Sequence, residues 1–313
     1  MKVLVPDVPL RREMEPLPAG VELVSEAAPD VDVLLLGPEL WDEDLDALLR
    51  QLPGLRLLQA FSAGVDSLLP LVGSGVIVCK AVGVHDTSVA EWVMAAILAM
   101  QRRLPELLDL QRKARWDRSM VEPEPGTRPI GDLEGKTVLV VGHGDIGRGL
   151  AVRLEPFGAN VVGVARRARD GVRSIDDLPR LLPEADVVVD LLPLTLATDR
   201  FVDANFLAQM KPGALFVNAG RGRTVDTDAL IEALHRGRIR AALDVTDPEP
   251  LPADHPLWRA PNLLITPHVA GTVTRWEERA FRFAGEQLRR FAAGQPLLGV
   301  EAGNMPASRQ PGH

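Results

Sequence analysis

The sequence is short of several features, and each shortage excludes a class of protein. It holds no tyrosine and a single cysteine, Cys79, in 313 residues. One cysteine cannot form a disulfide within the chain, and its place in the apolar run GVIVCK predicts a buried, unreactive thiol. The longest interior apolar run, Val93–Met100, is far shorter than the roughly 20 residues that a membrane-spanning helix needs.

The charge balance, the N-terminal residues and the spacing of the histidines narrow the class further. Asp and Glu outnumber Lys and Arg by 43 to 35, a net charge of −8. This balance argues against nonspecific binding to nucleic acid or acidic membranes. The first residues, MKVLVPDVPL, lack the apolar core and cleavage site of a signal peptide. The histidines show no metal-ligand spacing. We therefore expect a cytoplasmic enzyme without a metal.

Strands and helices alternate in two successive series, which predicts an α/β fold with parallel sheets. Apolar runs that predict strands lie at 3–5, 21–24, 31–36, 55–60 and 76–80, then at 136–142, 160–165, 186–192, 214–219, 240–245 and 262–268. Helical spacing is found at 40–52, 65–72, 86–104 and 274–294. Residues 117–136 indicate a loop, and the tail 301–313 has no periodicity and is expected to be disordered.

Three polar residues follow apolar runs in the second series. Arg221 lies near the end of ALFVNAGRG, Glu249 lies near the end of AALDVTDPEP, and His268 ends LLITPH. Ligands of an open parallel sheet bind at the carboxyl ends of its strands, so one sheet edge would collect a cation, a carboxylate and an imidazole. A cation that holds an anionic substrate and a histidine tuned by a carboxylate are suited to moving a proton. A solvated turn carboxylate remains the alternative for Glu249.

A glycine motif supplies a cofactor site for the same edge. Gly142, Gly144 and Gly147 form G-x-G-x-x-G between a predicted strand and a predicted helix, the context that dinucleotide binding requires. About 20 positions on, an NAD site usually has an acidic residue, but Ala165 stands there, followed by Arg166 and Arg167. The two arginines predict a cradle for the 2′-phosphate of NADP, with NAD still possible. A solvated basic turn is the alternative.

With these motifs in view, the chain resembles the D-isomer-specific 2-hydroxyacid dehydrogenases. The most specific stretch is residues 191–230, and AALDVTDPEPLP and LLITPHVAGT follow in the expected order. AFSAGVDSL and SVAEWVM resemble the family's substrate loop and interdomain helix. The resemblance implies a Rossmann cofactor domain, 101–284, inserted in a flavodoxin-like α/β substrate domain made of 1–100 plus 285–313, with the active site in the crevice between them.

The resemblance also assigns roles to residues. It makes His268 the general acid/base, Glu249 its hydrogen-bond partner, and Arg221 the ligand of the substrate carboxylate and keto oxygen. The backbone amides of Ala63 and Gly64 would hold the other side of the carboxylate. Residues expected along the cofactor are Gly142, Gly144, Asp145, Ile146, Gly147, Arg166, Arg167, Pro193, Thr198 and Asp244. Trp116 and Trp276 are open to either substrate contact or packing.

The expected function is therefore reduction of a short 2-keto acid to a D-2-hydroxy acid with NAD(P)H. Glyoxylate and hydroxypyruvate are the expected substrates by analogy with family members that carry basic residues after the second cofactor strand. The alternative is a dinucleotide-sensing corepressor, which would need no acid/base pair. Relatives pair through the cofactor domain, so we expect a homodimer to which the apolar helix Val89–Met100 contributes.

Overall fold

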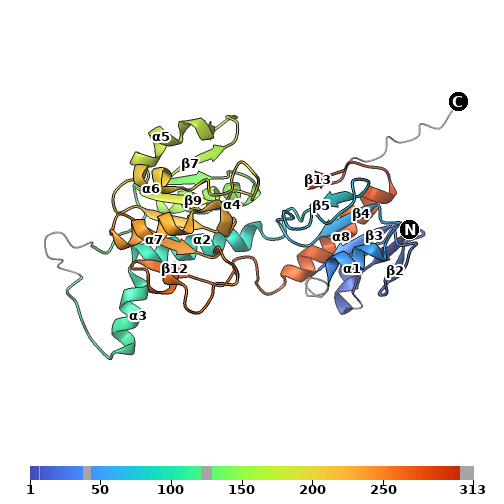
Figure 1. The fold of residues 1–313 in the computed structure, drawn as a ribbon, viewed down its shortest axis with the longest axis horizontal. Helices are drawn as coiled ribbons and strands as arrows, with labels where there is room; N and C mark the ends of the chain where they lie inside the picture. The colour runs from blue at the N-terminus through green and yellow to red at the C-terminus, as the bar shows by residue number, and fades with distance from the viewer. Residues whose placement is uncertain (7, 38–43, 121–128, 304–313) are drawn as a thin grey trace. The chain divides into compact units, whose positions relative to one another are not determined.

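The computed structural model describes residues 1–6, 8–37, 44–120 and 129–303. The chain forms two compact units, each described separately below (Figure 1). Unit 1 is made from both ends of the chain, Met1–His85 and Val273–His313, whereas unit 2 is the continuous segment Asp86–Thr272.

Unit 1 is built on one sheet with the strand order β13-β5-β4-β3-β1-β2. Its strands are β1 (Lys2–Leu4), β2 (Glu22–Val24), β3 (Val33–Leu36), β4 (Leu57–Ala60), β5 (Ile77–Cys79) and β13 (Val300–Ala302). The first five are parallel in the order 2-1-3-4-5, which is the flavodoxin-like order, and β13 adds an antiparallel edge. Every residue of β3, β4 and β5 is buried, as expected of parallel strands covered on both faces.

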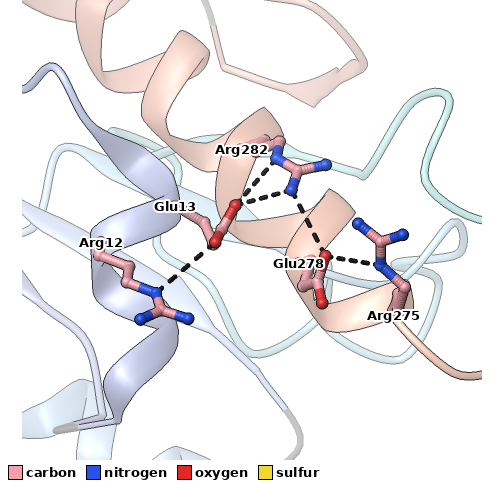
Figure 2. A network of polar contacts seen from close by, with 5 residues as sticks. All are labelled: Arg12, Glu13, Arg275, Glu278 and Arg282. Carbon is pink, nitrogen blue, oxygen red and sulfur yellow. Dashed lines mark hydrogen bonds and ion pairs between the residues drawn. The ribbon is translucent and has the colours of Figure 1, made fainter.

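The helices of unit 1 join the two ends of the chain. They are η1 (Pro9–Met14), α1 (Leu45–Arg50) and α8 (Trp276–Ala292). Figure 2 shows an ion network that links η1 to α8: Glu13 lies 2.8 Å from Arg282, which also contacts Glu278 at 3.4 Å. Beneath it, Ala280, Phe281 and Ala284 of α8 share a core with β1 and β3. Burial of this apolar face holds α8 in unit 1.

Unit 2 has a seven-stranded parallel sheet in the order β12-β11-β10-β9-β6-β7-β8. Its strands are β6 (Thr137–Val141), β7 (Asn160–Ala165), β8 (Val172–Ser174), β9 (Val187–Asp190), β10 (Leu215–Asn218), β11 (Arg240–Leu243) and β12 (Leu263–Ile265). Renumbered from β6, the order is 3-2-1-4-5-6 with a seventh strand added, which is the Rossmann arrangement. The order reverses between β6 and β9, so a crevice is expected at the carboxyl ends of these two strands.

Helices cover both faces of this sheet, and one further helix, α3 (Leu104–Arg112), has no buried residue. The others are α2 (Asp86–Gln101), α4 (Asp145–Leu154), η3 (Glu155–Phe157), η4 (Ile175–Asp177), α5 (Leu178–Leu181), η5 (Leu182–Glu184), α6 (Ala204–Gln209), η6 (Gly222–Thr224), α7 (Thr227–His235) and η7 (Pro256–Arg259). Alternate residues of β6 enter opposite layers: Val138 and Val140 pack with α2 and α4, whereas Leu139 and Val141 pack with α5, α6 and α7.

The observed unit boundaries correct the expected ones, 1–100 and 285–313. Helix α2 belongs to unit 2, because Val93 and Ile97 are fully buried in one cluster with Val138 and Leu150. Helix α8 belongs to unit 1 from its first turn. Most apolar side chains of α2 pack within unit 2, but Ala95 is exposed and Trp92 and Leu98 are half-buried, so a contribution of Val89–Met100 to a dimer contact stays a prediction.

Several local expectations also differ from the structure. Residues 65–72 form successive turns rather than the expected helix. The sequence misled because Val65 and Leu68 are buried with an i, i+3 spacing, which turns share with helices. Strands β8 and β13 were not expected, and β13 includes the start of the 301–313 tail, whose residues 304–313 lie outside the described part. Within the described residues, no helix combines the length and apolar character needed to cross a membrane, and no group of three His, Cys, Asp or Glu side chains is placed to hold a metal ion.

Candidate active site

Three adjacent strands deliver the predicted trio to one edge of the unit 2 sheet. Arg221 follows β10, Glu249 lies in the loop after β11, and His268 follows β12. Asn218, Leu243 and Ile265 are paired in register across these parallel strands, so their loops leave the same edge. The sequence interpretation that placed these residues at strand ends agrees with this arrangement.

His268 and Glu249 form a close pair. Imidazole Nδ1 lies 2.5 Å from Glu249 Oε1, and both side chains are about half exposed. The hydrogen bond that His268 Nδ1 donates to Glu249 is the main cause that raises the pKa of His268, and the Glu249 charge adds to it. The same hydrogen bond lowers the pKa of Glu249. Because Nδ1 faces the carboxylate, Nε2 is the ring nitrogen left to exchange a proton with a substrate.

Asp244 fixes the backbone that carries His268. Its carboxylate is buried and accepts hydrogen bonds from Thr266 Oγ1 (2.5 Å) and from the amides of Val269 (3.0 Å) and Ala270 (2.8 Å). The amide of His268 donates to the Asp244 carbonyl at 2.7 Å. His268 has a left-handed φ of 53°, which this set of bonds holds. The structure thus gives Asp244, expected at the nicotinamide, a role in the histidine loop.

Arg221 lies in a loop that is packed against the loop of Glu249. A Cβ atom on Gly222 would lie 1.9 Å from the carbonyl oxygen of Thr246, so only glycine allows this approach. Arg221 Nη1 donates to the Gly220 carbonyl at 2.9 Å. Its positive charge contributes to the lowered pKa of Glu249 and opposes the raised pKa of His268, which indicates that the three charges act on one another.

A buried carboxyl group beneath this loop was not singled out in the sequence. Asp190 ends β9 and is 1 % exposed, and its Oδ2 lies 2.6 Å from the hydroxyl of Thr224. Burial raises the pKa of Asp190 to about 6. The signal available in the sequence was an acidic residue inside the apolar run VVVDLL.

The glycine motif forms the turn from β6 into α4. Gly142 has a φ of 96°, and a Cβ there would lie 2.6 Å from the backbone carbonyl of Leu191. A Cβ on Gly144, by contrast, would meet nothing within 4 Å, which leaves space above the helix N-terminus. The first amides of a helix lack intrahelical partners and attract anions. These features fit the pyrophosphate of a dinucleotide, with Asp145 and Ile146 at the first turn of α4.

Basic side chains gather at the end of β7. Ala165 is the last residue of the strand, and Arg166 and Arg167 follow as exposed residues. In the described part of the chain, neither guanidinium has an ion-pair partner. Arg169 donates to the carbonyl of His143 at 2.5 Å, which joins this turn to the glycine motif. A phosphate on the 2′ position of an adenine ribose would meet positive charge here.

The other expected contacts lie on two separate loops. Pro193 and Thr198 share the loop after β9, where Thr198 Oγ1 donates to the Pro193 carbonyl at 2.6 Å. Ala63 and Gly64 lie in unit 1, in the loop after β4, and among the described residues no hydrogen bond uses their amides. Trp276 packs against the ring of His85 in unit 1, with ring centroids 5.4 Å apart.

Comparisons with known proteins find a matching family model and similar sequences. Residues 94–270 match the family model described as the NAD-binding domain of D-isomer-specific 2-hydroxyacid dehydrogenases. The chain is 38 % identical over 262 residues to the glyoxylate/hydroxypyruvate reductase B of Escherichia fergusonii, covering 80 % of this chain and 78 % of that protein.

Two solved structures show the same similarity with different cofactors. An NADPH-dependent glyoxylate/hydroxypyruvate reductase from Sinorhizobium meliloti, in complex with NADP and sulfate, gives a TM-score of 0.79 at 27 % identity over 96 % of both chains. An NAD-dependent formate dehydrogenase from Staphylococcus aureus, in complex with NAD, gives 0.72 at 25 % identity over 91 % of this chain and 88 % of that one.

Proposed function

The chain belongs to the D-isomer-specific 2-hydroxyacid dehydrogenases, and we propose that it reduces glyoxylate or hydroxypyruvate to the corresponding hydroxy acid. The observation that carries the proposal is the 2.5 Å pair of His268 and Glu249, next to Arg221 at the carboxyl edge of a Rossmann sheet. The printed activities of the E. fergusonii and S. meliloti proteins support these two substrates. The corepressor alternative is set aside, because these relatives are oxidoreductases.

The residues divide the work of a carbonyl reduction among them. His268, protonated through its contact with Glu249, donates a proton to the keto oxygen. Arg221 binds the substrate carboxylate and polarises the carbonyl group, because a guanidinium offers several donors in fixed geometry. When bound, the nicotinamide cofactor would supply the hydride.

The cofactor we propose is NADP in preference to NAD. Ala165 offers no carboxylate to a ribose 2′-hydroxyl, and Arg166 and Arg167 are exposed where the 2′-phosphate would lie. The similar structures include one with NADP and one with NAD, so family membership alone does not decide the cofactor. The support for NADP therefore comes from these three positions. Asp145, Ile146, Pro193 and Thr198 are proposed to line the rest of the dinucleotide.

We also propose a homodimer that pairs through α3 of unit 2. This helix has no buried residue, and Figure 1 shows it extending away from the rest of its unit. Leu104 and Leu108 on α3 are 45 % and 47 % exposed, and Trp116, just beyond it, is 94 % exposed. Large apolar side chains gathered on one projecting element indicate an interface, and two-fold symmetry is the usual way to close one.

The proposed activity is tested by following NADPH oxidation with a panel of 2-keto acids. Glyoxylate and hydroxypyruvate should be reduced with higher kcat/KM than pyruvate or longer keto acids. As a control, the variant Arg180→Ala, which removes one exposed arginine on α5 away from the site, should show the same order of substrates as the wild type. A clear preference for a longer or branched keto acid would overturn the substrate assignment while leaving the reaction class in place.

A further inference from the structure

Asp190 is a buried carboxyl group that the proposed mechanism does not use. Its Oδ1 accepts the amide N–H of Leu192 at 2.9 Å, and its Oδ2 lies 2.6 Å from the Thr224 hydroxyl. In register, its neighbours are Val141 on β6 and Asn218 on β10, neither of which is charged. The carboxyl group therefore has one partner, the Thr224 hydroxyl, that is able either to donate or to accept a proton.

The Thr224 hydroxyl has two close oxygen partners and only one proton. Its Oγ1 lies 2.6 Å from Asp190 Oδ2 and also 2.6 Å from the carbonyl oxygen of Arg221. Such a distance is typical of an O–H···O hydrogen bond, and two oxygens this close repel each other unless a proton lies between them. The two contacts need two protons, and a carbonyl has none to give. The second proton must come from the carboxyl group of Asp190.

We propose that Asp190 is a positioning residue for Arg221: its neutral carboxyl group donates to the Thr224 hydroxyl, which in turn donates to the Arg221 carbonyl. Burial, which disfavours the charged form, supports this assignment because it raises the pKa of Asp190 to about 6. When the carboxyl group ionises, it accepts the threonine proton, and the contact with Arg221 is lost. The inference rests on the proposed function, since the substrate role of Arg221 gives the positioning its effect.

The loop of Arg221 keeps other hydrogen bonds when the hydrogen bond between Thr224 and the Arg221 carbonyl breaks. The Arg221 carbonyl also accepts from Asn218 Nδ2 at 3.0 Å and from the Thr224 amide at 3.2 Å. We therefore expect a shifted Arg221 rather than an unfolded loop, and an effect on KM for the keto acid rather than on stability. One neutral hydrogen bond corresponds to a change of about five-fold.

The charged groups on the neighbouring elements have partners elsewhere. On the η6 side, Arg223 pairs with Asp199 at 2.6 Å, and Arg221 Nη1 bonds the Gly220 carbonyl. Asp244, after β11, is held by the 266–270 loop.

His268 and Glu249 titrate at the same sheet edge, but loss of the His268 proton lowers kcat, and it does so at higher pH because the pKa of His268 is raised. The two pH dependences are therefore separable.

The test measures KM for glyoxylate with saturating NADPH between about pH 5 and pH 8. Wild-type KM should rise about five-fold as Asp190 ionises. Asp190→Asn should keep the low KM throughout, because its amide donates to Thr224 at every pH. Thr224→Val should show the high KM throughout, and Thr224→Ser should follow the wild type. An Asn variant with wild-type pH dependence, or a Val variant with wild-type KM, would overturn the inference.

Two further measurements separate this inference from the proposed function. Asp186→Asn removes a carboxylate that pairs with Lys211 at the opposite end of β9, and its KM profile should match the wild type. Infrared spectra should contain a protonated carboxyl band at about pH 5 that Asp190→Asn lacks. If that band is absent, the inference fails whatever the activity. If the band is present but no keto acid is reduced, the proposed function fails instead.

Discussion

Removing the two arginines after β7 should remove most of the enzyme's preference for NADPH over NADH. A hydrogen bond to a charged group contributes about 1.5–3 kcal/mol, and about 1.4 kcal/mol corresponds to a factor of ten. One good contact with the 2′-phosphate would give roughly a tenfold to hundredfold preference in kcat/KM. Because Arg166 and Arg167 are both exposed, screening reduces that figure, and the Debye length is only about 8 Å at physiological salt.

The assay compares kcat/KM for NADPH and NADH with one keto acid, at low and at physiological salt. The double variant Arg166→Ala, Arg167→Ala should lose most of the NADPH preference, chiefly through the KM of NADPH. Arg180→Ala, which removes an exposed arginine on α5, should keep the wild-type ratio and wild-type salt dependence. Equal or better use of NADH by the wild type would refute the reasoning. An unchanged ratio in the double variant would show that another group reads the phosphate.

The trio and the interface give four further expectations. His268→Gln should lower kcat by about 10²–10⁴-fold while leaving cofactor affinity intact, and a variant with more than half of wild-type kcat would contradict its role. Arg221→Ala should damage both KM and kcat, whereas an effect on KM alone would restrict it to anchoring. Reductive kcat should fall as pH rises above the raised pKa of His268, and Glu249→Gln should move that fall to lower pH; kcat profiles that superimpose would exclude the coupling. Light scattering should show a dimer that the double variant Leu108→Ser, Trp116→Ser shifts toward monomer, and a wild-type monomer at micromolar concentration would count against the interface.

Most strands of both sheets were predictable, because parallel strands buried on two faces have continuous apolar sequences. For runs such as ALFVNA and DVVVDLL, no other element of similar length fits the pattern. The short strands β8 and β13 carry no such run, since VRS and VEA are held by their neighbours' backbones rather than by apolar burial. The unit boundaries were missed because the sequence of α2 shows that it is buried, but not in which core.

The candidate site was predictable where residues follow strands directly, and less so where contacts cross between loops. Arg221 and His268 stand close behind apolar runs, so the parallel sheet places them at one edge. The contact of Thr224 with Asp190 joins residues 34 positions apart and depends on how the loop after β10 turns back over β9. No local sequence pattern predicts that contact. The role of Asp244 in the histidine loop was missed for the same reason.

The construction of unit 1 from both ends of the chain sets the order in which the protein can be completed during synthesis. Unit 2 is continuous and can fold once Thr272 has left the ribosome, because domains generally fold as units as they emerge. The first 85 residues must wait for α8 and β13, which cover their core and their open sheet edge. Until then the edge of β5 and the apolar surface facing α8 stay exposed. The nascent N-terminal segment is therefore the part of this protein that most needs protection from aggregation.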